Sequence, residues 1–177
     1  MLVAGLWGFA EATLFFLVPD IWLTALAVRR GLKPALLACL AALAGALLGG
    51  VAMYGWGAAN PEAARDMLDW VPAIDPAMIA KVRIALREDG VTAMFLGPLY
   101  GVPYKIYAVE AAGTGISLAA FLAISIPARM LRFLLLTIGS WAISAALSGR
   151  TSPRFRTGLL AGVWAVFYAA YFTIMGI

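Results

Sequence analysis

The sequence predicts an all-α polytopic membrane protein that forms a single transmembrane domain over residues 1–177. Of its 177 residues, 64% are hydrophobic and 12% are charged, and the mean hydropathy is +0.94. A chain with so few polar residues cannot cover a water-soluble globule. Some of its apolar segments are interrupted by proline and others are continuous. We therefore expect two opposed re-entrant helical hairpins, about three full transmembrane helices and an extramembrane amphipathic helix pair.

The first apolar run, residues 1–28, is interrupted by Pro19, which removes a helical hydrogen bond. Two alternatives stay open: a single kinked span, or a re-entrant hairpin that enters the lipid before Pro19 and returns after it. Glu11 and Asp20 favour the hairpin. On one unbroken helix their separation of nine positions would put them on roughly opposite sides, whereas a break lets both face one cavity.

The next segment, Pro34–Ala59, is the clearest transmembrane helix, because it is long, apolar and free of charge. Gly45 and Gly49 give it a small-xxx-small pattern, which permits close contact between helices. Residues 1–59 therefore combine the first hairpin with a full span. The basic residues that precede this span are Arg29, Arg30 and Lys33.

The only polar stretch, residues 60–90, predicts the amphipathic helix pair. Asn60-Pro61 and Asp75-Pro76 each fit an N-cap followed by proline at the first helical position. We expect the second helix to lie along the membrane surface or to cap the bundle, with a solvated connector as the alternative. Its apolar residues share one face at helical spacing: Met78, Ile79, Val82 and Leu86.

The second broken segment, Val91–Gly115, carries the strongest sign of re-entry. Its interruptions free backbone N–H and C=O groups that hydrocarbon cannot satisfy, so the segment belongs inside protein or beside water. The pieces Val91–Leu96 and Tyr104–Ala112 would rise only about 9–14 Å as helices, against roughly 30 Å of bilayer core. The residues that break the segment are Gly97, Pro98, Gly101 and Pro103.

The remainder of the chain predicts further spans. Ile116–Leu147 is long enough to cross with tilt, and it completes a second unit over residues 91–147. A basic loop, Gly149–Thr157, precedes a final aromatic-rich span over residues 157–177.

Charge distribution favours the hairpins over straight crossings. If the second broken segment returns to its own side, the basic loops at residues 29–33 and 149–157 both face the cytoplasm, and the acidic stretch at residues 60–90 lies outside. This is the outline of an inverted repeat whose broken helices meet near the midplane, as in secondary transporters. We expect a multi-pass protein of the bacterial inner (cytoplasmic) membrane.

Ionisable residues within the apolar sequence are the candidates for function. Each costs about 2.5–3.5 kcal/mol at mid-membrane, so pairing between acids and bases is expected. The alternative is that they are structural ion pairs or residues that snorkel to the interface. We expect Glu110 at the interface. The residues are Glu11, Asp20, Lys105, Glu110, Arg129 and Arg132.

Other function classes have little support. The chain contains no histidine and a single cysteine, Cys39, so we expect no metal site, no cofactor and no redox chemistry. No nucleophile with a neighbouring base is evident, so an enzyme is not expected. Basic residues that flank membrane spans explain the net charge of +4, so nucleic acid is not an expected partner.

A cavity lined by the remaining charges would suit an anionic headgroup. Arginine offers a bidentate fork to phosphate, and lysine a point charge. Carboxylates beside them would take up and release protons. The expected substrate- and proton-coupling residues are Glu11, Asp20, Lys105, Arg129 and Arg132.

Three stretches resemble conserved parts of DedA-type membrane proteins, also called the VTT or SNARE-associated family. Glu11 to Asp20 is similar to that family's E-x8-[E/D] stretch. Pro98 to Gly113 resembles its second stretch, with Lys105 where the second of two arginines stands and no counterpart for the first. Ala128 to Phe133 is similar to the basic patch of its next helix. The resemblance spans roughly Gly8 to Phe133.

The resemblance implies opposed re-entrant hairpins and lipid translocation as the activity. Bacterial members are associated with proton-dependent flipping of polyprenyl-phosphate or phospholipid, and eukaryotic members with scrambling. The missing arginine leaves the choice of substrate open.

We therefore expect a transporter, a flippase or scramblase, that moves a phospholipid or polyprenyl-phosphate carrier and is coupled to protons. The alternatives are a non-transporting scaffold for membrane integrity and a small-solute or drug exporter. Whether the protein forms a homo-oligomer is left open.

Overall fold

The computed structural model describes residues 1–175, with side chains to residue 173, and this part of the chain is all-helical. The end of the predicted final span, residues 176–177, lies outside the described residues. The elements in chain order are α1 (Leu2–Ala12), α2 (Asp20–Arg30), α3 (Leu32–Ala59), α4 (Pro61–Asp69), α5 (Pro76–Glu88), α6 (Val91–Leu96), the 3-10 turn η1 (Gly97–Tyr100), α7 (Tyr104–Gly113), α8 (Leu118–Leu147) and α9 (Pro153–Met175).

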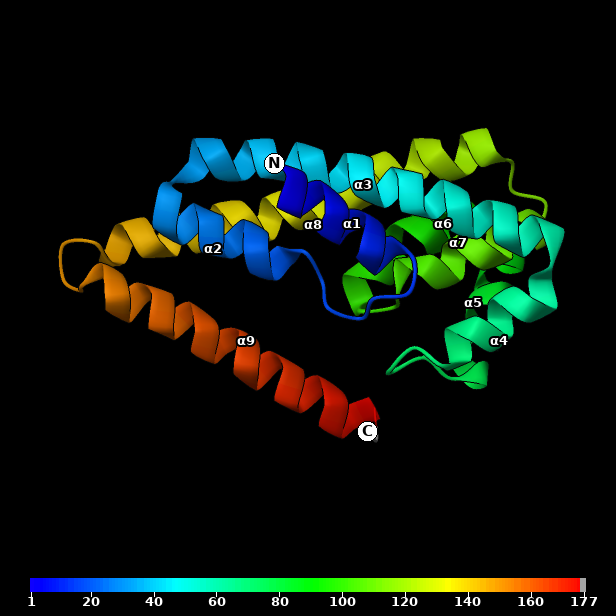
Figure 1. Cartoon of the computed structure of the whole chain (residues 1–177). Coiled ribbons are helices and arrows are strands. Elements are labelled where there is room, and N and C mark those ends of the chain that lie inside the picture. The colour runs from blue at the N-terminus through cyan, green and yellow to red at the C-terminus, as the bar shows by residue number, and fades with distance from the viewer. Residues whose placement is uncertain (176–177) are drawn as a thin grey trace.

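Three helices, α3, α8 and α9, are long and apolar enough to cross a membrane. They contain 28, 30 and 23 residues. Helices α3 and α8 run alongside each other, and α9 slants away from them (Figure 1). The predicted all-helical fold with three long apolar helices is confirmed at this level. These helices form the frame against which the short helices pack.

The first broken segment reverses direction between α1 and α2 (Figure 1). The helix ends at Ala12, well before Pro19, so the break begins earlier than the proline predicts. A side-chain contact favours this early end, because Trp7 Nε1 donates a hydrogen bond to the carbonyl oxygen of Leu17 at 3.0 Å. Such bonds satisfy backbone oxygens that a helix would otherwise satisfy. Pro19 directly precedes α2.

Close helix contact holds α1 on α3. A Cβ atom at Gly45 would overlap the carbonyl oxygen of Gly5, so only glycine permits this approach. A Cβ atom at Gly57 would likewise overlap the carbonyl oxygen of Val109, where α7 lies against α3. Glycines of α3 therefore permit close packing of one short helix from each broken segment, α1 and α7.

The second broken segment also reverses, through α6, η1 and a turn into α7. The turn contains Gly101, whose φ of 88° is a left-handed conformation that favours glycine. Pro98 lies inside η1, where it fits the first turn, and Pro103 directly precedes α7. The predicted breaks therefore coincide with the ends of these short elements, and Gly97 begins η1.

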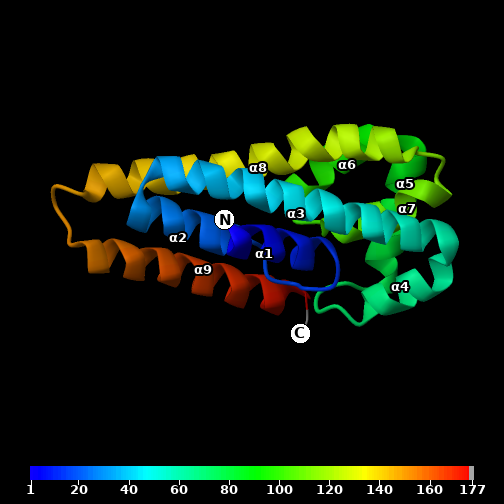
Figure 2. The same ribbon diagram turned by 45° about the horizontal axis from the view of Figure 1, so that its top comes forward.

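The polar stretch forms α4 and α5, which cap one end of the bundle (Figure 2). Asn60 accepts a hydrogen bond from the Ala63 N–H at 3.1 Å, and Asp75 accepts one from the Met78 N–H at 2.7 Å, so both predicted N-caps are present. The apolar face of α5 packs inward through residues that include Ile79, Val82 and Leu86.

The last helix begins earlier than the sequence predicts. Ser152 Oγ accepts a hydrogen bond from the Phe155 N–H at 3.2 Å, and Pro153 occupies the first helical position. Arg154 and Arg156 therefore belong to α9, and the predicted basic loop is shorter. This loop and the turn between α2 and α3 lie at the same end of the bundle, opposite α4 and α5 (Figure 1).

Candidate functional site

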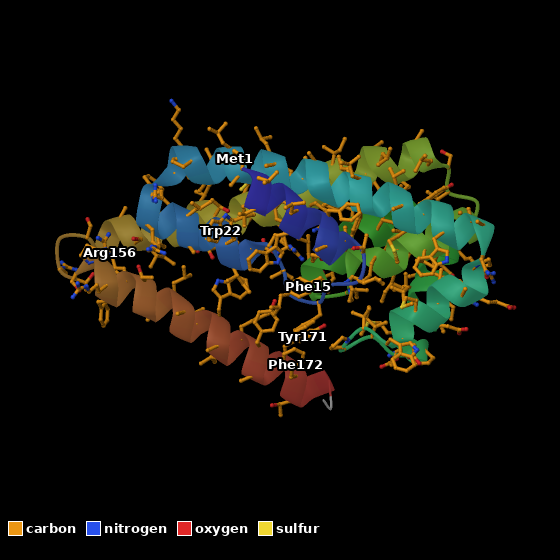
Figure 3. All side chains as sticks on the ribbon, viewed as in Figure 1. Met1, Phe15, Trp22, Arg156, Tyr171 and Phe172 are labelled. Atoms are coloured by element: carbon orange, nitrogen blue, oxygen red, sulfur yellow. The ribbon has the colours of Figure 1, made fainter. Side chains whose placement is uncertain are left out.

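The two broken segments meet in the interior of the bundle. Lys105 Nζ, at the start of α7, donates a hydrogen bond to the carbonyl oxygen of Phe15 at 2.6 Å. Phe15 belongs to the loop between α1 and α2, which faces the C-terminal part of α9 (Figure 3). The lysine side chain therefore caps a backbone carbonyl that the first break leaves free. This contact joins segments 90 residues apart in sequence.

Glu11 and Arg129 form a buried ion pair between α1 and α8. Glu11 exposes 4% of its surface and Arg129 exposes 2%. The arginine guanidinium also lies over two aromatic rings, 4.6 Å from the centre of Tyr104 and 5.2 Å from the centre of Phe133. The rings and the carboxylate together offset the cost of burying this charge.

Asp20 and Arg132 form a second pair, with Arg132 Nη2 at 2.6 Å from Asp20 Oδ2. Asp20 is buried, whereas the Arg132 side chain retains 20% of its exposure. Arg129 and Arg132 are three positions apart on α8, so they lie on the same side of that helix. One face of α8 therefore holds both acids of the first broken segment.

The cations outnumber the acids in this cluster. Lys105, Arg129 and Arg132 face only Glu11 and Asp20, and no carboxylate of the described residues lies within ion-pair distance of Lys105. Lys105 is nevertheless 2% exposed. The cluster therefore carries a surplus positive charge in an apolar environment, which favours an anion nearby.

A cavity of about 760 Å³ opens beside these charges. This volume lies within the roughly 300–1,000 Å³ that is usual for ligand sites. Its charged lining residues are Glu11, Asp20, Lys105 and Arg132. The rest of the lining is mainly apolar and comes from the loop between α4 and α5, from η1, and from α8 and α9.

Several polar atoms of the cluster have no hydrogen-bond partner among the described residues. They are Asp20 Oδ1 and the Nε and Nη1 atoms of Arg129. Buried polar groups are nearly always paired, so each unpaired one calls for an explanation. Asp20 lines the cavity, although its Oδ1 atom is itself buried.

Glu110 does not join this cluster. Its Oε1 atom accepts a hydrogen bond from Arg65 Nε at 2.6 Å, and its Oε2 atom accepts one from Arg83 Nε at 2.9 Å. Glu110 is 1% exposed, and its partners come from the capping helices α4 and α5. Its interfacial position relative to a membrane stays a prediction. The hydrogen bond from Arg65 to Glu110 raises the pKa of Arg65 above its usual value, against a smaller opposing effect of desolvation.

Sequence reasoning missed the part of the site that belongs to α9. Trp164 Nε1 donates a hydrogen bond to Thr24 Oγ1 at 3.0 Å, and the Val18 N–H donates one to Tyr168 Oη at 3.0 Å. The second bond satisfies a backbone donor at the first break. The signal was present in the sequence, because Trp164, Tyr168 and Tyr171 recur at helical spacing on one face.

Comparison of the chain with protein-family models, with curated proteins and with solved structures finds no match.

Proposed function

We propose that this protein translocates a lipid with an anionic, phosphate-bearing headgroup across a membrane. The observation that carries the proposal is the buried Lys105 ammonium group, which has no carboxylate within ion-pair distance among the described residues and lines a cavity of about 760 Å³ beside Arg132. A lysine point charge next to an arginine fork suits phosphate. A phosphate there would balance the surplus positive charge of the cluster.

The proposal includes a membrane topology with two opposed re-entrant hairpins. The tips of α1–α2 and α6–η1–α7 meet at the bond from Lys105 to Phe15, and the two segments approach from opposite ends of the bundle (Figure 1). Many secondary transporters form their substrate site where broken helices meet near the midplane of the bilayer. The basic turns at one end would face the cytoplasm of a bacterial inner membrane.

Cysteine accessibility tests this topology. Cys39 is buried and is the only cysteine, so it would be replaced before single cysteines are introduced at Leu2 and Thr114. We expect an impermeant maleimide to label Leu2→Cys from the cytoplasmic side and Thr114→Cys from the opposite side. Labelling of both positions from one side would contradict opposed hairpins.

Reconstituted vesicles test translocation directly. The probe is a fluorescent phosphatidic acid, and the measurement is the rate at which its headgroup becomes accessible to an impermeant quencher. Lys105→Met should slow this rate roughly 10- to 150-fold, because a hydrogen bond to a charged group is worth about 1.5–3 kcal/mol. Arg83→Met is the matched control. It also removes one cation, but it leaves Glu110 paired with Arg65 and does not touch the cavity lining.

Each outcome of this assay decides between the alternatives. Equal slowing by both variants would remove Lys105 from the mechanism. If the unmodified protein does not accelerate the movement of the lipid probe, translocation is contradicted and a membrane-integrity scaffold is favoured. Uptake of a soluble solute by the same vesicles would instead favour an exporter. Elution of each variant as one species in detergent shows that loss of activity is not loss of fold.

Proton coupling forms the second part of the proposal, and Asp20 is its centre. Its Oδ2 atom accepts a hydrogen bond from Arg132 Nη2, whereas Oδ1 has no partner among the described residues. A proton that binds to Oδ1 therefore neutralises the carboxylate and ends the ion pair, while Oδ2 still accepts the hydrogen bond from Arg132. Asp20→Asn should make translocation insensitive to an imposed pH gradient. An undiminished response of this variant to the gradient would remove Asp20 from the coupling.

The likeness to DedA-type proteins supports the same proposal, and we propose that the chain is a divergent member. The position that lacks the family's first arginine lies near Gly97, where a Cβ atom would overlap the hydroxyl group of Tyr107. A long side chain therefore does not fit at Gly97. The second cation of the cavity is Arg132, on α8.

A further inference from the structure

Helix α9 is hydrogen-bonded to the bundle along one side. Its bonds from Trp164 to Thr24 and from the Val18 N–H to Tyr168 both join it to the first broken segment. It packs mainly against α2, and it diverges from the other helices as it leaves the loop after α8 (Figure 1). The cavity occupies the space between α8 and α9.

The rim of the cavity between these two helices is apolar and open. Leu135 on α8 and Val163 on α9 both line the cavity, yet they are 60% and 58% exposed. Both helices are long and apolar enough to cross a membrane, and both residues lie well inside them. In a membrane this opening therefore faces hydrocarbon rather than water.

Two parts of the cavity lining differ in chemistry. Lys105 is 2% exposed, whereas the aromatic lining residue Phe167 is 49% exposed, so the charged part of the lining is buried and an apolar part is open. A volume of about 760 Å³ suits a headgroup with the beginning of a chain, since ligand sites of roughly 300–1,000 Å³ enclose drug-sized molecules and a two-chain lipid is larger. The remaining hydrocarbon must lie outside the cavity.

We infer that the gap between α8 and α9 is a lateral portal for the hydrocarbon chain of an anionic amphiphile. The headgroup contacts Lys105 and Arg132, while the chain passes between Leu135 and Val163 and stays in the bilayer. This inference rests on the proposed function and deepens it, because it assigns the place where the hydrocarbon chain of the anionic lipid leaves the cavity for the bilayer. Soluble phosphate compounds would leave the apolar opening unfilled.

Photolabelling tests the portal. The probe is a phosphatidic acid with a diazirine near the headgroup end of one chain, in phosphatidylcholine vesicles that contain the protein. We expect the carbene to label Leu135 and Val163 several-fold more than Val166. Val166 is the internal control, because it is 70% exposed on the same helix as Val163 but does not line the cavity. Equal labelling of Val166 and Val163 would mean ordinary lipid contact and would overturn the portal.

Two tryptophan variants sharpen the test. Val163→Trp narrows the gap and should reduce labelling of Leu135 several-fold, whereas Val166→Trp, on the outer surface, should not. A phosphatidylcholine probe with the same diazirine chain should show no preference for the gap, because its headgroup carries no net charge. The portal would be abandoned if Val163→Trp left the labelling of Leu135 unchanged, or if the phosphatidylcholine probe gave the same pattern.

Labelling does not depend on translocation, so the two proposals fail separately. Preferential labelling of the gap by a protein that moves no lipid would leave a lipid-binding portal and contradict the proposed function. Translocation that depends on Lys105 without preferential labelling of the gap would retain the function and contradict the portal. Elution of each tryptophan variant as one species in detergent excludes a failure to fold.

Discussion

Two clusters of buried charge occupy different parts of the bundle, and they differ in how completely their members are paired. In the end cluster, Glu110 receives hydrogen bonds on both carboxylate oxygens from Arg65 and Arg83. In the central cluster, Asp20 and Arg129 keep polar atoms without a partner among the described residues. Only the central cluster contributes residues to the large cavity.

The position of the partners explains this difference. Arg65 and Arg83 come from capping helices, and their side chains are 27% and 33% exposed. Their side chains are therefore less restricted by packing as they turn towards Glu110. Arg129 instead belongs to the middle of a long helix, where packing against Tyr104 and Phe133 restricts its orientation. In this orientation the Nε and Nη1 donors of Arg129 have no partner among the described residues.

The comparison teaches that burial of a charge does not by itself identify a functional residue. Glu110 and Asp20 are each 1% exposed. Glu110 is fully paired and attaches the capping helices to α7, which is a structural role. Asp20 combines a free oxygen with a cavity. We therefore propose Asp20 as the functional residue of the two, because it is incompletely paired and lies beside a cavity.

The largest expected effect is loss of the central ion pair. Arg129→Met leaves Glu11 buried without its partner, and breaking such a pair costs about 3–5 kcal/mol. The measurement is the free energy of unfolding in mixed micelles, from a denaturing-detergent titration. A loss below about 1 kcal/mol, the scale of an exposed pair, would show that Glu11 is not buried as a charge.

A smaller loss is expected at the end cluster. Glu110→Gln removes the carboxylate, but Arg65 and Arg83 are partly exposed and turn toward water. We expect about 1–2 kcal/mol in the same titration, because the lost bonds are charge-assisted but their donors are rehydrated. Translocation should be retained. Loss of translocation with this modest destabilisation would assign the end cluster a role beyond structure.

The smallest effect is expected when both partners of the central pair become apolar. The double variant Glu11→Leu/Arg129→Met leaves no uncompensated charge, and such replacements are often neutral. Its free energy of unfolding should lie within about 1 kcal/mol of that of the unmodified protein, far from the sum of the single losses. Additive losses would show that Glu11 and Arg129 do not act as a pair.

Much of the architecture could be predicted from local sequence. The continuous apolar helices, the N-caps at Asn60 and Asp75, and the short pieces on either side of Gly101 follow from composition, capping and proline placement. The end of α1 at Ala12 could not be predicted, because no proline or glycine marks it. It depends on contacts between Trp7 and Leu17 and between Lys105 and Phe15.

The candidate site could likewise be predicted only in part. The sequence identifies Glu11, Asp20, Lys105, Arg129 and Arg132 as ionisable residues in apolar surroundings. It cannot assign their partners, and it groups Glu110 with them although Arg65 and Arg83 satisfy that residue from a polar stretch. It also leaves out the aromatic face of α9, which forms a wall of the cavity.

The amino-acid sequence by itself determined that this chain is helical, that it is apolar enough for a membrane and that the second segment breaks around Gly101, because hydropathy, capping and proline chemistry act over a few neighbouring residues. The tertiary structure alone decided which acid meets which base, that Lys105 meets a carbonyl instead of a carboxylate, and that a cavity separates α8 from α9. Those outcomes depend on the distances between packed helices, which no local pattern specifies.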